Sequence, residues 1–388
     1  MSSASTKSSE ATLFSFACLA ALAKAWPGEG FGARAQAALD ALLNIGSDTA
    51  LVAINILAEK SRFPAFKQAA AERILAIADA RGLTPDELAD RLVPSLGLDE
   101  AGGAELDYGA QKFTVSFDER MLPVVIDASG GTLADLPKPK KTDDAAKAKA
   151  AKARLSALKK DAKATASLQI ARLERAMKTG RLIDGGLFVS AFAGHPWMRH
   201  LAQRLVWGAH DARGALVETF RVASDGELTN ARDEAFALGK DAKVSVVHPA
   251  RMPAGATDVW SALFGEYQIL QPFPQLSRPV FSPTAEERTA HALSRFRGRK
   301  ASYGALRGLE SRGWHRWMDD AVRFAKPMGP RRFAELETEP GWHPSQTAED
   351  IEPQTLGDVV LPEDVTLGAL DPVAFSELVY DVESITAS

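Results

Sequence analysis

The chain has 388 residues, of which 46% are hydrophobic and 25% charged, as is usual for globular proteins. This length allows two or three packed units, because a single hydrophobic core seldom grows beyond about 250 residues. The formal net charge of −4 provides no overall attraction to nucleic acid, and the single cysteine, Cys18, excludes an intrachain disulfide.

The first residues give no indication of export. Met1–Thr12 is rich in serine and threonine and lacks a cationic segment leading into a long apolar core, so we expect no secretory signal. The apolar run that follows is interrupted by Lys24 and by Trp26-Pro27-Gly28, too early for a membrane span. A chain without disulfides suits a reducing compartment. We therefore expect a cytoplasmic protein with no membrane segment.

Residues 1–100 are predicted to form a HEAT-like helical-repeat segment. Leu39 and Leu42 lie at helical spacing before Gly46, Ile74 belongs to a later helix, and Thr84–Glu87 has the pattern of a capping box. Helix pairs with one large apolar face stack into solenoids such as HEAT repeats. Because the units share no repeat signature in their sequence, an irregular helical bundle remains an alternative.

Residues 101–137 are predicted to form a β-hairpin segment, and residues 138–185 a long basic helix. The hairpin is expected from the β-prone runs Phe113–Phe117 and Leu122–Ile126, followed by the turn residues Asp127–Gly131. The helix is expected from Asp143 to Thr179, where an Ala-rich and Lys-rich sequence carries a narrow apolar stripe. Such a helix packs along one line and leaves its other faces in water.

Residues 186–332 are predicted to form a mixed α/β unit. Turn residues separate the β-prone runs, which indicates short strands connected by tight turns. Helices are expected at Pro196–Leu205 and Asp258–Phe264, and strands at Leu205–Ala209, Leu216–Val222, Val244–His248 and Tyr267–Gln271. A second capping box, formed by Thr284 and Glu287, predicts a helical region that extends to about Ala325.

Residues 333–388 form an acidic C-terminal segment, since no Lys or Arg follows Arg332. We expect a helix at Pro372–Val382, with Phe375, Leu378 and Val379 on one apolar face. Two segments earlier in the chain, Lys138–Arg181 and Arg288–Arg332, are rich in Lys and Arg. We expect the helix to dock on one of these basic segments, because neighbouring cations relieve repulsion among its carboxylates. The alternative is a disordered tail reserved for a partner. The predicted fold class is α+β and mainly helical.

The run Trp260–Pro279 contains Tyr267, Ile269 and Gln271 before a Pro-rich turn. It resembles a signature of bacterial proteins named after a molybdate metabolism regulator (MolR-like), whose conserved C-terminal domain has no assigned function. Four other stretches occur in the family's order, namely Gly82–Pro94, Leu136–Pro139, His195–Pro196 with Arg204–Trp207, and Gly308–Trp314.

The resemblance indicates which proteins accompany this family, and it implies no biochemical activity. Members of this family are generally larger, and their genes often accompany a MoxR-type AAA+ ATPase and a von Willebrand factor A protein. Many carry a Trp-Gly-Arg domain associated with nucleic-acid-linked proteins, and no such module is recognisable here. The family provides no catalytic residues to assign to this chain.

The residues themselves indicate no catalytic, cofactor or metal site. No two histidines have the helical spacing that lets both bind one metal ion, and no phosphate-binding glycine loop is present. Gln271, Gln275 and Arg278 are the candidates for a functional groove, because amides and a guanidinium beside a Pro-rich turn could present directional hydrogen bonds. The alternative is that these side chains satisfy backbone carbonyls inside the fold.

We therefore expect a noncatalytic regulatory scaffold or adaptor that makes protein contacts. From the resemblance, we expect its partners to include a MoxR-type AAA+ ATPase and a von Willebrand factor A protein. Two alternatives remain open. One is an enzyme whose active site lies near the Gln271–Arg278 turn. The other is a nucleic-acid-associated factor that uses the basic segments, although the basic helix lacks the aromatic residues that stack on bases.

Overall fold

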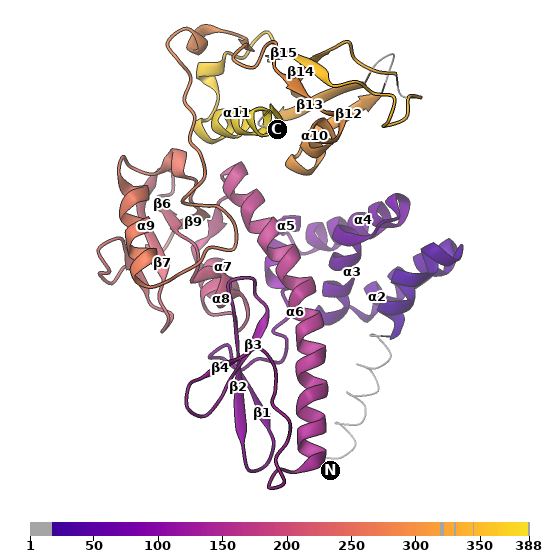
Figure 1. Cartoon of the computed structure of the whole chain (residues 1–388), viewed down its shortest axis with the longest axis vertical. Helices are drawn as coiled ribbons and strands as arrows, with labels where there is room; N and C mark the ends of the chain where they lie inside the picture. Colours follow the sequence, from indigo (N-terminus) through magenta and orange to yellow (C-terminus); the bar gives the residue numbers. More distant parts are fainter. Residues whose placement is uncertain (1–17, 319–321, 330, 344, 387–388) are drawn as a thin grey trace. The chain divides into compact units, whose positions relative to one another are not determined.

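The computed structural model describes residues 18–318, 322–329, 331–343 and 345–386 (Figure 1). Met1–Thr12, on which the expectation of no secretory signal depends, lies outside these residues. The chain forms two compact units. Unit 1 contains the described residues up to Leu173, together with Leu182–Val244 and Phe264–Phe273. Unit 2 contains Glu174–Arg181, Ser245–Leu263 and the described residues from Pro274 onward.

Unit 1 begins with short helices joined by tight connections. They are η1 (Trp26–Glu29), α2 (Gly32–Ile45), α3 (Asp48–Lys60), α4 (Pro64–Ala80) and α5 (Pro85–Arg91). Their apolar faces share one core, in which Leu39, Leu42 and Ile54 are fully buried. The predicted capping box is confirmed, because Thr84 accepts a hydrogen bond from the Glu87 amide while the Glu87 carboxylate accepts one from the Thr84 amide.

The predicted hairpin and long helix are both present. Antiparallel strands β1 (Ala104–Asp107), β2 (Lys112–Phe117), β3 (Pro123–Ile126) and β4 (Thr132–Leu133) form a meander. Helix α6 (Ala145–Thr179) runs beside this sheet, where Lys147 pairs with Asp107 at 2.8 Å (Figure 1). Further along, Arg172 of α6 pairs with the buried Asp90 of α5 at 2.7 Å. Among the described helices, none has both the length and the apolar character needed to cross a bilayer.

A second antiparallel sheet belongs to unit 1 except for Ser245 and Val246, the last two residues of its strand β9. Its strands are β5 (Ile183–Asp184), β6 (Trp207–His210), β7 (Leu216–Val222), β8 (Leu228–Asn230) and β9 (Lys243–Val246), in the order β5-β9-β6-β7-β8. Three short helical segments, α7 (Gly185–Phe188), η2 (Val189–Ala193) and α8 (Met198–Ala202), follow β5. Phe188, Phe192, Trp207 and Phe220 form an aromatic cluster with ring centroids 4.7 to 6.0 Å apart.

The strand predicted at Tyr267–Gln271 is absent, so this expectation was wrong. Helix α9 (Ala256–Glu266) ends instead in a Schellman motif, in which the Ile269 amide donates to the Phe264 carbonyl and the Gln268 amide to the Gly265 carbonyl. Gln268 takes the left-handed conformation that this motif requires, with φ of 54°. The chain after the helix is therefore an irregular turn.

The helical region predicted from Thr284 to about Ala325 was largely wrong, because strands of a six-stranded antiparallel sheet in unit 2 occupy much of this stretch. The Thr284–Glu287 hydrogen bonds do form, but they support only one short turn, η4 (Glu287–Thr289). Gly298 and Gly313 then adopt positive φ, which interrupts any helix. The strands are β10 (Ala292–Leu293), β11 (Lys300–Ala301), β12 (His315–Met318), β13 (Val322–Gly329), β14 (Arg332–Glu339) and β15 (Gln354–Val360).

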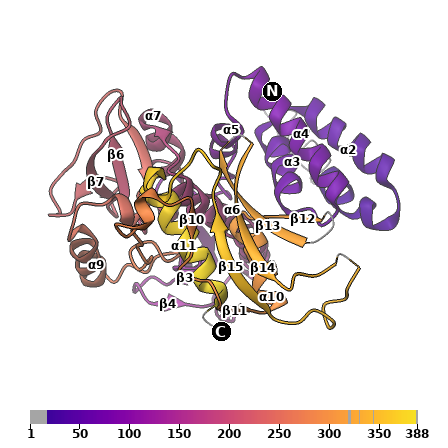
Figure 2. The same cartoon turned by 90° about the horizontal axis from the view of Figure 1, so that it is seen from above.

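The remaining helices of unit 2 are η3 (Pro249–Arg251), α10 (Tyr303–Gly308), η5 (Leu309–Arg312), η6 (Leu367–Ala369) and α11 (Pro372–Thr386). Helix α11 covers one face of the sheet (Figure 2), and its Phe375, Leu378 and Val379 side chains are buried in the core of the unit. Asp381 of α11 pairs with Lys326 of β13 at 2.6 Å. The expected docking of this helix is therefore confirmed, and the boundary predicted at residue 332 falls within the β13–β14 hairpin.

Candidate functional site

The three residues predicted for a groove are divided between the two units. Gln275 is completely buried in unit 2, where its amide donates to the Val247 carbonyl at 2.9 Å. Arg278, also in unit 2, is 6% exposed and bonded to carboxylates. Gln271 lies in unit 1, where its amide nitrogen is 3.4 Å from the Arg204 carbonyl oxygen. Gln275 and Arg278 thus satisfy internal partners.

Arg278 belongs to a buried ionic cluster on α11. Its Nε and Nη2 donate to Glu377 at 2.7 and 2.5 Å, and its Nη1 donates to Glu174 at 3.0 Å. His248 Nδ1 accepts from the Ala250 amide, so Nε2 carries the proton and donates to Glu377. Burial alone would raise the pKa of Glu377, but the hydrogen bonds from His248 and Arg278 lower it to about 2.

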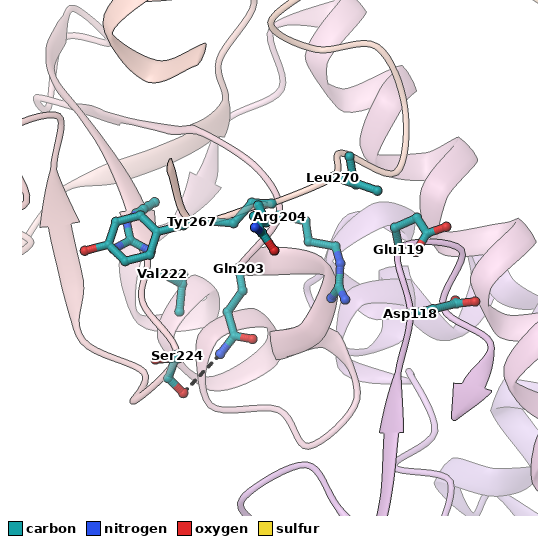
Figure 3. A pocket seen from close by; sticks show the side chains of 11 residues that line it. Asp118, Glu119, Gln203, Arg204, Val222, Ser224, Tyr267 and Leu270 are labelled. Carbon is teal, nitrogen blue, oxygen red and sulfur yellow. Dashed lines mark hydrogen bonds between the residues drawn. The ribbon is translucent and has the colours of Figure 1, made fainter. Parts of the chain in front are cut away.

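A concave site in unit 1 has a volume of ≈ 370 Å³ (Figure 3). We call it the α8 cleft, because the residues directly after α8 form its floor. Its lining combines two arginines, two amides, a tyrosine and aliphatic side chains. The lining residues are Asp118, Glu119, Gln203, Arg204, Arg221, Val222, Ser224, Tyr267, Gln268, Ile269 and Leu270.

Two histidines hold α8 in position. His195 accepts hydrogen bonds at Nδ1 from the amides of Trp197 and Met198, and its Nε2 bonds the Val93 carbonyl at 3.0 Å. His200 Nε2 bonds the Gly102 carbonyl at 2.8 Å. Gly102 has a φ of 84°, and a Cβ there would approach this His200 nitrogen to 2.7 Å, so only glycine allows the contact. The floor of the cleft is therefore tied to the N-terminal part of unit 1.

Arg204 is a half-buried cation without an ionic partner. Its Nη1 donates to the His200 carbonyl at 2.6 Å and its Nη2 to the Phe117 carbonyl at 2.9 Å. No carboxylate of the described residues lies within ion-pair distance of it. Burial lowers the pKa of Arg204, while the more distant charges of Asp118 and Glu119 act in the opposite direction. Figure 3 shows Arg204 extending toward the hairpin that carries these two acids.

Gln203 supplies a hydrogen-bond acceptor beside Arg204. Its Nε2 donates to the carbonyls of Ala223 and Ser224 at 3.1 and 3.4 Å, and Figure 3 marks the contact with Ser224. Nothing within the described residues donates to its Oε1. A guanidinium donor and an amide acceptor therefore both line the cleft.

The opposite wall consists of Tyr267 stacked on Arg221. The Arg221 guanidinium lies 4.4 Å from the centre of the Tyr267 ring and donates to Asp233 at 2.8 Å. The Tyr267 hydroxyl donates to the other Asp233 oxygen at 2.5 Å, and these two bonds lower the pKa of Asp233. Arg221 is only 6% exposed and its Nε has no hydrogen-bond partner. Tyr267 itself is 49% exposed, so it presents an aromatic surface held by fixed contacts.

Sequence reasoning identified part of this site indirectly. Arg204 begins the stretch Arg204–Trp207, and Tyr267 and Ile269 belong to the run Trp260–Pro279, both of which carry the family resemblance. The structure brings these stretches together in the cleft. Gln203 and Arg221 were missed, because nothing in their local sequence separates them from ordinary surface or strand residues.

No group of three or more His, Cys, Asp or Glu side chains in the described part of the chain is arranged to hold a metal ion.

Comparisons with known proteins assign no activity to this chain. Residues 130–314 match the model of a family described as "Domain of unknown function (DUF4132)". This region contains the cleft residues from Gln203 to Leu270. The chain is also similar to "Uncharacterized protein YehI" of Escherichia coli (strain K12), with 38% identity over 321 residues. That alignment covers 82% of this chain and 26% of the relative, so the chain spans about a quarter of the relative's length. No solved structure matches the chain.

Proposed function

We propose that this chain is a noncatalytic adaptor that binds a segment of a partner polypeptide in the α8 cleft. The observation that carries the proposal is the mixed lining of the cleft. Arginine and tyrosine are enriched in the cores of protein interfaces, and a peptide backbone needs both donors and acceptors. Arg204 supplies donors, Gln203 an acceptor, and Leu270, which is 61% exposed, an apolar contact.

The conformation of Gln268 supports the same site. A left-handed residue at the end of a helix is usually glycine, because a side chain there costs about 1–2 kcal/mol. Unfavourable backbone conformations of this kind cluster at functional sites. Gln268 nevertheless adopts a φ of 54° and lines the cleft. A polar side chain at this position gives the cleft another donor and acceptor at the expense of local stability.

Peptide selection tests this proposal. Short random peptides displayed on phage are selected against the intact chain, and their affinities are then measured by fluorescence anisotropy. We expect Leu270→Ala and Tyr267→Ala to weaken binding by about tenfold or more, as for central interface residues. The matched control is Val217→Ala on β7, an aliphatic residue that is 67% exposed and outside the cleft. Peptides that bind all three variants equally would contradict the proposal.

We further propose that the setting implied by the MolR-like resemblance applies here. In this proposal the protein acts in the cytoplasm, the N-terminal helices α2–α5 form a HEAT-like platform, and the partners include a MoxR-type AAA+ ATPase and a von Willebrand factor A protein. What supports it is the succession of short amphipathic helices that share one core. Measuring the binding of the purified ATPase and von Willebrand factor A protein to this chain and to Leu270→Ala would test it directly.

A further inference from the structure

We propose that the partner segment places a carboxylate group on Arg204 in the α8 cleft. This inference rests on the proposed polypeptide-binding function and specifies its chemistry. Either a C-terminal carboxylate or an Asp or Glu side chain could supply the group, and both offer two oxygens to a planar guanidinium.

The first argument is the unsatisfied hydrogen-bonding capacity of Arg204. A guanidinium has five N–H donors, and the carbonyls of His200 and Phe117 accept two of them. These carbonyls are neutral, so they fix the orientation of the side chain without compensating its charge. Buried and half-buried charges in proteins are normally paired. Among the described residues Arg204 has no such pair, so an anion from outside the chain would complete its environment.

The second argument is that the nearby acids do not already fill this role. Asp118 Oδ1 accepts hydrogen bonds from the amides of Arg120 and Leu122, which fixes it within its own turn. Glu119 lies 3.8 Å from Arg120, and its side chain is 40% exposed. Both acids remain beyond ion-pair distance of Arg204. Their charges oppose an incoming carboxylate without occupying its position, so removing one of them should strengthen binding.

The third argument concerns the other residues that line the cleft. They can bind the backbone N–H and the side chains that accompany a carboxylate in a polypeptide. Gln203 Oε1 can accept a backbone N–H, since nothing in the described structure donates to it. Leu270 and Ile269 offer an apolar surface for a neighbouring side chain. An isolated inorganic anion would use only the guanidinium. The cleft therefore fits an acidic peptide segment better than a free anion.

The test uses small probes that separate the two sources of a carboxylate. N-acetylglycine carries only a terminal carboxylate, and N-acetylaspartate N′-methylamide carries only a side-chain carboxylate. Their neutral counterparts are N-acetylglycinamide and N-acetylasparagine N′-methylamide. Binding to the intact chain is followed by NMR through the Nε–Hε signal of Arg204, which is assigned from its loss in Arg204→Lys. We expect at least one carboxylate probe to shift this signal and neither neutral probe to do so.

Variants provide the second readout. Arg204→Gln should weaken binding of the effective probe about tenfold or more, because a charge-assisted hydrogen bond is lost. The matched control is Arg213→Gln, which removes the same charge from an exposed turn of unit 1. Because Arg204 also bonds backbone carbonyls, its variant could misfold. Glu119→Gln avoids this difficulty and should strengthen binding of the carboxylate probe about twofold to threefold, with no change for the neutral probes.

The outcomes distinguish this inference from the proposed function. Peptides that bind the cleft while both carboxylate probes leave the Arg204 signal unchanged would overturn the carboxylate inference alone. Equal shifts with carboxylate and neutral probes would overturn it as well. In a third outcome, a carboxylate probe binds at Arg204 but the selected peptides bind equally well to the cleft variants. This result would support the carboxylate site and contradict the adaptor function.

Discussion

Glu377 illustrates how a single buried carboxylate can make the stability of unit 2 depend on pH. Its side chain is 4% exposed and receives hydrogen bonds from His248 and Arg278. Burial acts to raise its pKa, but these bonds lower the pKa from 4.5 to about 2. A depressed carboxyl pKa stabilises the fold above the unfolded value and loses that effect as the pH falls toward the folded value. The contribution at neutral pH is on the order of 3 kcal/mol.

We predict that Glu377→Gln destabilises unit 2 at pH 7 by about 3–5 kcal/mol, because the amide removes the negative charge that pairs with the buried Arg278 and places an NH2 donor opposite Arg278 Nη2. The variant should also lose the part of the pH dependence that falls between pH 4.5 and 2. Urea unfolding at pH 7 and at pH 3 measures both effects, and Glu335→Gln on the exposed side of β14 is the control. If the variant and the wild type lose stability in parallel on acidification, Glu377 is not the titrating group.

The sequence correctly predicted the helices and the hairpin that local interactions determine. Helix α6 and helix α11 lie where their apolar spacing indicated, and the Thr84 capping box starts α5. The hairpin β2–β3 follows from two β-prone runs and the turn between them. In each of these cases the backbone hydrogen bonds that define the element join residues close in sequence, although α6 and α11 pack on partners distant in sequence. Local pattern was therefore sufficient.

The wrong predictions occurred where partners distant in sequence decide the structure. The region 284–325 carries a capping box, yet β10 and β11 pair with β15, more than fifty residues later. The cleft also depends on contacts between segments distant in sequence. The residues after α8, strand β7, the hairpin β2–β3 and the residues after α9 each contribute part of its lining. No local pattern shows that Gln203 and Arg204 will face Tyr267. Gln271 was selected for its polar atoms, but its amide nitrogen donates to the Arg204 carbonyl and the residue does not line the cleft.

The end of α9 provides a prediction at the scale of a single element. Replacing Gln268 by glycine removes the strain of a left-handed side chain but adds flexibility to the unfolded chain, and these effects partly cancel. We therefore expect Gln268→Gly to leave stability unchanged or to raise it by up to about 1 kcal/mol, while weakening selected peptides severalfold. Urea unfolding and fluorescence anisotropy measure the two effects. A loss of more than about 1 kcal/mol would show that the Gln268 side chain stabilises the turn.

At the scale of the whole molecule, the chain contains separate hydrophobic cores. One joins the N-terminal helices of unit 1, and another lies between α11 and the sheet of unit 2. Both units are discontinuous in sequence, because the chain enters unit 2 at Glu174 and returns to unit 1 at Leu182 and again at Phe264. Domains with their own cores can open independently, each with its own local free energy. A substitution that unfolds one core should therefore leave the other core folded.

The N-terminal helices allow this independence to be tested. Leu42 of α2 is fully buried, so Leu42→Asp places an unpaired charge in the apolar core, which costs several kcal/mol and should unfold α2–α4. Hydrogen exchange measured by mass spectrometry should show loss of protection in α2–α4 and retained protection in α11 and β14. Leu75→Asp is the matched control, because Leu75 of α4 is 52% exposed and its replacement leaves the core intact. Loss of protection in α11 together with α2–α4 would mean that the two cores unfold as one cooperative structure, and unchanged protection in α2–α4 would mean that Leu42 does not support the helical core.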